Sequence, residues 1–214
     1  MVHLGDIGSS RQACGDAWLQ ARKQQFARIR HPFVLLPGDN EWADCKDSIV
    51  RLEQWRKLFC IEKRILNFKK QGGPFCEHIR WEAAGFVFVA LNVPGNNNNV
   101  RHPEHAPRMA AVHQWLDEAA KLAESRDGLV VLMQANPFLS LPRDGYVDLR
   151  KKLTALGETM PGKIILLHGD THTWRDDEPL PGVRRIEVWG SPFVSWLAAG
   201  IAGGRLGASA PRHR

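Results

Sequence analysis

The chain lacks a long apolar run. None of its apolar segments approaches the roughly 20 residues that a membrane-spanning helix needs. Its first residues also lack the charged-then-apolar pattern of a secretory signal peptide. As written, the sequence therefore predicts a cytoplasmic protein without a membrane span. If the native N-terminus lies further upstream, a periplasmic or exported protein remains open.

Several chemical signatures are also missing. The four cysteines have no CxxC spacing, which argues against a structural zinc site. A glycine-rich phosphate loop is absent, which argues against a nucleotide-binding switch, and no serine stands in a GxSxG context, which argues against a serine hydrolase. The 29 Lys and Arg residues are spread along the chain and 23 acidic residues offset them, so there is no nucleic-acid-binding stripe. The formal charge of +6 still suits a small anionic substrate.

What the chain does contain is a repeated strand ending. Three short apolar runs each stop at a Gly-Asp pair, and the three pairs end at Asp6, Asp39 and Asp170. Short apolar runs are typical of buried strands, and ligands of open α/β sheets bind outside the carboxyl ends of such strands. One such aspartate would be interpreted as a helix N-cap, but three, with His168 and His172 beside the last, indicate a metal site.

The 214 residues are 43% hydrophobic, which fits one globular domain with a substantial core. Strands alternate with helices, so we expect an α/β fold with a mixed sheet flanked by helices. The strands are expected at about 2–4, 33–36, 129–133 and 164–167, with a hairpin formed by 78–83 and 86–93. The helices are expected at about 16–30, 47–60, 103–125 and 146–156. Pro94-Gly95 and the four asparagines that follow predict a flexible loop.

The last residues differ in character from the rest. Ala, Gly and Arg dominate residues 198–214, without apolar periodicity. We therefore expect a domain over residues 1–197 and a disordered tail over 198–214. Cys14 and Cys45 each lie shortly after a Gly-Asp pair and can approach one another. A disulfide between them in an oxidising compartment and two buried free thiols both remain open.

The segments HLGDIG, LLPGDNEWADC and LLHGDTHTW resemble motifs of the calcineurin-like metallophosphoesterases, in particular a bacterial branch with a GDNEW-type second motif. The similarity covers roughly residues 2–197. It implies the calcineurin-like fold, two divalent metal ions at the carboxyl edge of the sheet and hydrolysis of a small phosphorylated substrate. Manganese, iron, zinc and magnesium are not distinguished by the sequence. Paired cations assist such reactions because they acidify a water molecule and neutralise the attacking and leaving oxygens.

The resemblance also assigns roles to residues. Asp6 matches the metal-bridging aspartate, Asp39 takes the metal-binding Asn position, and Asp170 and His172 take the places of the two histidines in the last motif. Asn40 stands where the family has its acid histidine, although a shift of one residue would make Asn40 itself the ligand. His168 is expected to contact the phosphate or to orient a ligand.

Other positions depart from the family pattern. Gln134-Ala135-Asn136-Pro137 replaces a metal-histidine motif, and an amide oxygen there suits magnesium or calcium better than zinc. Met1 falls inside what would be the second strand, so either the true start lies upstream or the first strand and one metal ligand are lacking. The tail after Leu197 replaces an expected strand, and one hypothesis is that it is translated out of frame.

We therefore expect a metal-dependent phosphoesterase that hydrolyses a phosphomonoester or phosphodiester. The alternative is an inactive, truncated or degenerate phosphoesterase-like domain that acts, if at all, as a binding module. The absence of the first strand and of a histidine near Gln134 favours this alternative. The sequence leaves the substrate and the oligomeric state open.

Overall fold

The computed structural model describes residues 1–60, 68–140, 142–193 and 195–209. Its centre is a mixed sheet of seven strands in the order β3-β4-β5-β6-β7-β9-β8. Strands β5, β6, β7 and β9 run parallel to one another, whereas β3-β4, β4-β5 and β8-β9 pair antiparallel. The strands of this sheet are β3 (Lys69–Lys70), β4 (Ile79–Ala83), β5 (Phe86–Ala90), β6 (Gly128–Leu132), β7 (Ile164–His168), β8 (Arg175–Leu180) and β9 (Val183–Glu187). The expected α/β architecture with a mixed sheet is confirmed, and so is the hairpin, formed by β4 and β5.

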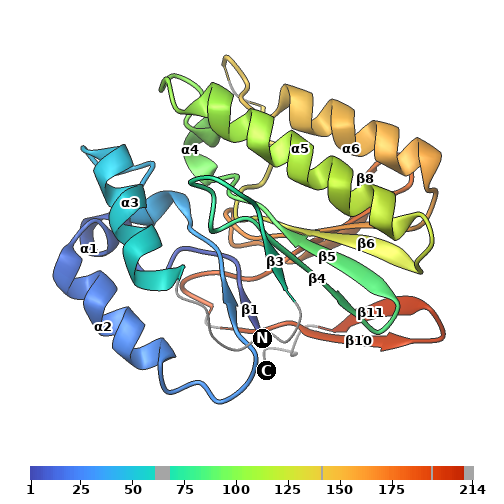
Figure 1. Ribbon diagram of the computed structural model, residues 1–214, viewed down its shortest axis with the longest axis horizontal. Helices are drawn as coiled ribbons and strands as arrows, with labels where there is room; N and C mark the ends of the chain where they lie inside the picture. The colour runs from blue at the N-terminus through green and yellow to red at the C-terminus, as the bar shows by residue number, and fades with distance from the viewer. Residues whose placement is uncertain (61–67, 141, 194, 210–214) are drawn as a thin grey trace.

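Two long helices cover one face of this sheet (Figure 1). They are α5 (His105–Ala123) and α6 (Val147–Thr159), within two residues of the expected boundaries except at the end of α6. Alternate strand residues such as Val87, Val131 and Leu166 pack against them in one core cluster. The burial follows from the sequence, because side chains of a strand point alternately to its two faces.

Two small sheets cover the opposite face of the seven-stranded sheet (Figure 1). The first joins β1 (Val2–His3) and β2 (Val34–Leu35) in parallel. The second is an antiparallel hairpin of β10 (Ala198–Ala202) and β11 (Arg205–Ser209). Val34 of the first sheet, Leu36 directly after it and Leu206 of the second sheet join the same core cluster. Three layers result, with the large sheet in the middle.

The hairpin corrects the prediction of a disordered tail for residues 198–209. Gly203 and Gly204 form its turn, with φ of +56° and +68°. Two glycines are favoured in a two-residue hairpin turn because they accept positive φ. This turn signal was present in the sequence, but the low apolar content around it hid the strands. Residues 210–214 lie outside the described part of the chain.

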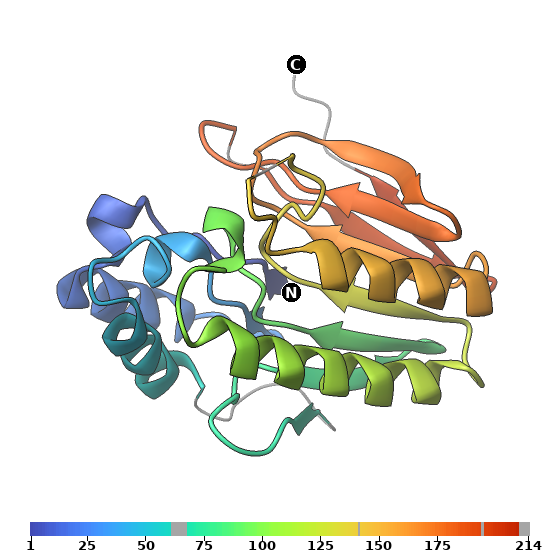
Figure 2. The same cartoon turned by 90° about the horizontal axis from the view of Figure 1, so that it is seen from above.

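The remaining helices gather at one end of the molecule (Figure 2). They are α1 (Ser10–Ala13), α2 (Asp16–Phe26) and α3 (Ser48–Phe59), with the 3-10 turn η1 (Asp39–Glu41) between α2 and α3 and the short turn α4 (Gly95–Asn98) after β5. Leu19, Leu58 and Ile7 form a separate core cluster beneath α2 and α3. Among the described residues, no helix combines the length and apolarity needed to cross a membrane.

Candidate functional site

The three aspartates of the Gly-Asp pairs come together in the structure. Asp6 follows β1, Asp39 follows β2, and Asp170 follows β7 of the large sheet. The amide nitrogen of Gln134, beyond the end of β6, donates hydrogen bonds to Asp6 at 2.9 Å and Asp39 at 3.0 Å. We call Asp6, Asp39 and Asp170 the aspartate cluster. It lies where the small β1-β2 sheet meets the carboxyl edge of the large sheet.

Two glycines allow this close approach. A Cβ atom at Gly38 would lie 2.1 Å from Oδ1 of Asp6. A Cβ atom at Gly95 would lie 2.4 Å from Oδ2 of Asp39 and 2.9 Å from Oδ1 of Asp170. A side chain at either position would therefore displace a carboxylate of the cluster. The glycine of the second Gly-Asp pair, Gly38, is thus needed because a side chain there would clash with Asp6. No sequence pattern indicated the similar role of Gly95.

Burial controls the charge of the aspartate cluster. Burial raises the pKa of Asp6, and the nearby carboxylate of Glu41 raises it further. Burial also raises the pKa of Asp39, as does the adjacent charge of Asp6. The pKa of Asp170 is raised by burial as well, although a hydrogen bond from the backbone of Asn136 opposes this. The cluster therefore favours the approach of a positive charge or a hydrogen-bond donor.

Glu41 fixes the two loops that carry Asp6 and Asp39. Its fully buried carboxylate accepts hydrogen bonds from the backbone amides of Gly38 at 2.6 Å, Asp6 at 3.1 Å and Ile7 at 2.6 Å. These bonds link the end of β1 to the end of β2. The sequence analysis assigned no such role to Glu41. A glutamate three residues after the residue that starts a helical turn is the signal that predicts a backbone contact of this kind.

Asp170 is held by the segment that follows β6. Its Oδ2 accepts a hydrogen bond from the backbone amide of Asn136 at 2.9 Å. The side chain of Asn136 donates to Thr171 at 3.2 Å and accepts from the backbone of Phe138. Asn136 therefore positions the loop of Asp170 through its backbone and side chain.

The other predicted site residues lie in different settings. Asn40 donates its backbone amide to Asp39 at 3.1 Å and to Asp6 at 3.4 Å, so its described role at the cluster is through the main chain. His172 is exposed, has a φ of +57°, and its charge lowers the pKa of Asp170, which places it beside that carboxylate. The structure thus brings both residues to the aspartate cluster.

His168 lies away from these carboxylates in the described contacts. Its side chain is fully buried, and Nδ1 is 2.9 Å from the carbonyl oxygen of Gly169. Burial lowers its pKa to about 4, so the imidazole is neutral at pH 7. A fully buried neutral imidazole is not accessible to a phosphate in this conformation. Of the two expected roles of His168, its burial favours orientation of the neighbouring loop over direct contact with a phosphate.

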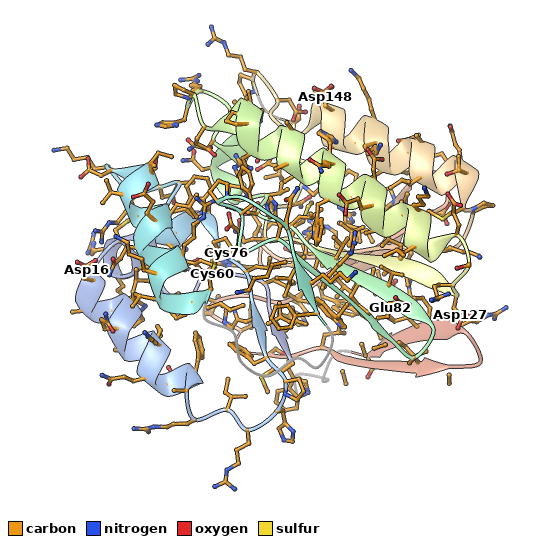
Figure 3. The ribbon with its side chains drawn as sticks, in the orientation of Figure 1. Asp16, Cys60, Cys76, Glu82, Asp127 and Asp148 are labelled. Carbon is orange, nitrogen blue, oxygen red and sulfur yellow. A yellow bond between two sulfur atoms is a disulfide. The ribbon has the colours of Figure 1, made fainter. Side chains whose placement is uncertain are left out.

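Both pairs of cysteines form disulfides in the structure. Cys14 is joined to Cys45, and both sulfur atoms lie 3.7 Å from the carbonyl oxygen of Asn40. Of the two alternatives for Cys14 and Cys45, the structure therefore has the disulfide. Cys60 is joined to Cys76, a pairing that the sequence analysis did not consider (Figure 3).

One group of possible metal ligands is tightly spaced within the described residues. Cys60, Cys76 and Glu77 form the one group there whose ligand atoms all lie within 4.8 Å of one another. Because the two sulfurs are bonded to each other, this group is not a metal site. The ligand atoms of the aspartate cluster do not all lie within 4.8 Å of one another. The amide of Gln134 lies between the carboxylates of Asp6 and Asp39. Its oxygen ligands still suit a hard cation such as Mg²⁺, Mn²⁺ or Ca²⁺.

The four asparagines form an ordered turn beside the cluster. Asn96 to Asn99 all have φ between +48° and +56°, a left-handed conformation that asparagine tolerates better than most residues. Asn98 is buried, and its Oδ1 accepts a hydrogen bond from Arg108 at 2.7 Å. Asn96, Asn97, Asn99, Val100, Arg101 and Pro142 line a surface hollow. The asparagines that the sequence assigned to a flexible loop therefore shape a hollow next to Gly95.

Comparison with known protein families found no matching family model, and comparison with curated proteins found no match. The functional argument therefore rests on the residues of the site.

Proposed function

We propose that this protein is a metal-dependent phosphoesterase of calcineurin-like fold, which hydrolyses a small phosphomonoester or phosphodiester. The observation that carries the proposal is the convergence of Asp6, Asp39 and Asp170 from three strand ends. Two of these strands belong to one sheet and the third to another. Like charges gathered from distant parts of the chain are costly unless they bind a cation or share donors, so the arrangement favours a cation-dependent activity.

In this proposal the aspartate cluster and His172 hold one or more divalent cations. A bound cation supplies charge neutralisation on the phosphoryl oxygens and acidifies a water molecule. Glu41 and Asn136 keep the carboxylates aligned through the backbone contacts described above. The hollow lined by Asn96, Asn97, Asn99 and Arg101 accepts the rest of the substrate, because amide groups and a guanidinium bind polar, anionic molecules.

The disulfides bear on where the protein acts. Structural disulfides persist in oxidising compartments and are rare in the cytosol. We infer from Cys14–Cys45 and Cys60–Cys76 that the protein matures in an oxidising setting rather than in the cytoplasm that the sequence alone indicated.

The test of the proposed function is hydrolysis of p-nitrophenyl phosphate and bis(p-nitrophenyl) phosphate with Mn²⁺ or with EDTA. We expect Mn²⁺-dependent turnover that falls about a hundredfold or more in Asp6→Asn and Asp39→Asn. Each variant removes a negative charge that, in this proposal, binds the cation. Asp148→Asn, at an exposed position on α6 (Figure 3), is the matched control and should retain full activity.

One observation favours a second candidate, a non-catalytic domain. The amide of Gln134 donates to two of the three carboxylates, so the chain itself supplies a partner for part of their charge. A folded wild-type protein that hydrolyses neither ester with Mn²⁺, Mg²⁺ or Ca²⁺ would support this candidate and contradict the proposed activity.

A further inference from the structure

Gln134 occupies the middle of the aspartate cluster. Its side chain is 2% exposed, and its Nε2 donates to Oδ2 of Asp6 at 2.9 Å and to Oδ1 of Asp39 at 3.0 Å. One NH₂ group thus joins two of the three carboxylates of the cluster, at the position toward which a cation would be attracted.

The orientation of this amide is fixed from the other side. The backbone amide of Gly95 donates to Oε1 of Gln134 at 2.5 Å. If the side-chain amide were reversed, its NH₂ group would face the N–H of Gly95 and its carbonyl oxygen would face two carboxylates. Both contacts would be repulsive. The hydrogen-bonding groups around Gln134 therefore require its donors to point into the aspartate cluster.

The spacing of the carboxylates matches this arrangement. Ligand atoms around a divalent cation lie about 2.0–2.6 Å from the ion, whereas hydrogen-bond acceptors lie about 2.9 Å from a donor nitrogen. The aspartate cluster has the wider spacing, since its ligand atoms do not all fall within 4.8 Å of one another. In the described conformation, Oδ2 of Asp6 and Oδ1 of Asp39 lie at hydrogen-bonding distance from one amide nitrogen, which suits a shared donor.

We propose that the amide of Gln134 takes the place of a cation in the metal-free protein, and that a divalent cation binds the aspartate cluster only by displacing it. This inference rests on the proposed function, because it assumes that the cluster binds a metal. It makes Gln134 a residue that weakens metal binding, rather than the metal ligand that its place in the chain suggests. The protein would then bind metal only when the cation is abundant.

Mn²⁺ binding to the full chain, measured by isothermal titration calorimetry, tests the inference. Gln134→Leu and Gln134→Met keep most of the side-chain volume and remove both donors. Hydrogen bonds to charged groups contribute about 1.5–3 kcal/mol each, so we expect either variant to bind Mn²⁺ about tenfold more tightly or better. Gln71→Leu is the matched control, since Gln71 is a buried amide that bonds Ala111 and His78 instead, and its Mn²⁺ affinity should equal that of the wild type.

A second readout does not depend on turnover. In EDTA, Gln134→Leu and Gln134→Met should melt at lower temperature than the wild type, because the carboxylates lose their shared donor. Saturating Mn²⁺ should then raise their melting temperature by more than it raises that of the wild type.

The outcomes separate the two proposals. Weaker or unchanged Mn²⁺ binding in folded Gln134→Leu and Gln134→Met would overturn the inference but leave the phosphoesterase proposal standing. If the wild type and both variants bind no Mn²⁺ and show no metal-dependent hydrolysis, both proposals fail.

Discussion

At the scale of single residues, the site depends on groups that satisfy the backbone as much as on the aspartates. The carboxylate of Glu41 accepts hydrogen bonds from three backbone amides, and the backbone amide of Asn136 donates one to Asp170. A buried carboxylate without these donors would be strongly disfavoured, and burial does raise the pKa of Glu41. The Glu of the GDNE segment is thus a structural support for the loops that carry Asp6 and Asp39.

Glu41→Ala should destabilise the protein by about 3 kcal/mol or more. The substitution leaves three backbone amides without this acceptor, two of them buried, and each unsatisfied buried group costs about 1–3 kcal/mol. Glu41→Gln keeps one acceptor oxygen and should cost less. Urea unfolding measures both values. Equal stability of Glu41→Ala and the wild type would contradict the role that we assign to this side chain.

At the scale of elements, each disulfide staples a different part of the fold. Cys14–Cys45 joins the end of α1 to the segment after η1 and contacts the carbonyl oxygen of Asn40. Cys60–Cys76 joins the end of α3 to the approach of β4, and its sulfurs line a pocket with Trp55 and Phe59. The first disulfide therefore lies beside the loop that carries Asp39, whereas the second lies at the end of α3.

Removal of the two disulfides should have separable effects. The bonds span 31 and 16 residues, so each loss should destabilise the protein by about 3 kcal/mol through greater freedom of the unfolded chain. Only the paired substitution Cys14→Ser with Cys45→Ser should also weaken Mn²⁺ binding, because only this bond contacts the loop of Asp39. The paired substitution of Cys60 and Cys76 serves as the control. Thermal unfolding and Mn²⁺ titration of both variants decide the matter, and equal Mn²⁺ affinities would argue against a link between the first disulfide and the site.

At the scale of the whole molecule, the large sheet is covered on both faces. Some titratable side chains are therefore buried as well. His78 is fully buried just before β4 and lies 2.7 Å from Oε1 of Gln71. Burial lowers the pKa of His78 to about 4, below its ordinary value of 6.5. The folded protein therefore keeps this imidazole neutral where an unfolded chain would protonate it.

His78 should contribute a loss in the free energy of unfolding as the pH falls from 6.5 toward 4. In this window the unfolded chain binds a proton at His78 and the folded protein does not, so protonation at this residue favours unfolding. One pH unit corresponds to about 1.4 kcal/mol, so the contribution of His78 between pH 7 and pH 5 should be a loss of about 2 kcal/mol. The raised pKa values of Asp6 and Asp39 act in the opposite direction in both proteins, so urea unfolding at the two pH values should show a difference of this size between the wild type and His78→Gln. His31→Gln, at an exposed position, should behave like the wild type, and a His78→Gln variant with an unchanged pH dependence would refute the prediction.

The sequence by itself determined the features that local patterns encode. Short continuous apolar runs specified the parallel strands, helical spacing of apolar residues specified the helices that cover them, and the Gly-Asp pairs indicated that Asp6, Asp39 and Asp170 meet at one edge. Such inferences succeed because strand and helix periodicity depend on residues that are close in the chain. The hairpin over 198–209 was missed because its weakly apolar strands become stable only when Leu206 packs against the large sheet.

Only the tertiary structure decided what surrounds the aspartates. The bond between Asp6 and Gln134 joins residues 128 positions apart, and no local pattern predicts the direction of that amide. Other features also depend on how distant segments pack together. They are the three backbone hydrogen bonds accepted by Glu41, the burial of His168 and the pairing of Cys60 with Cys76. Hydrogen-bond partners are determined by which groups meet when the layers pack, because a buried polar group must find a partner wherever the fold places one.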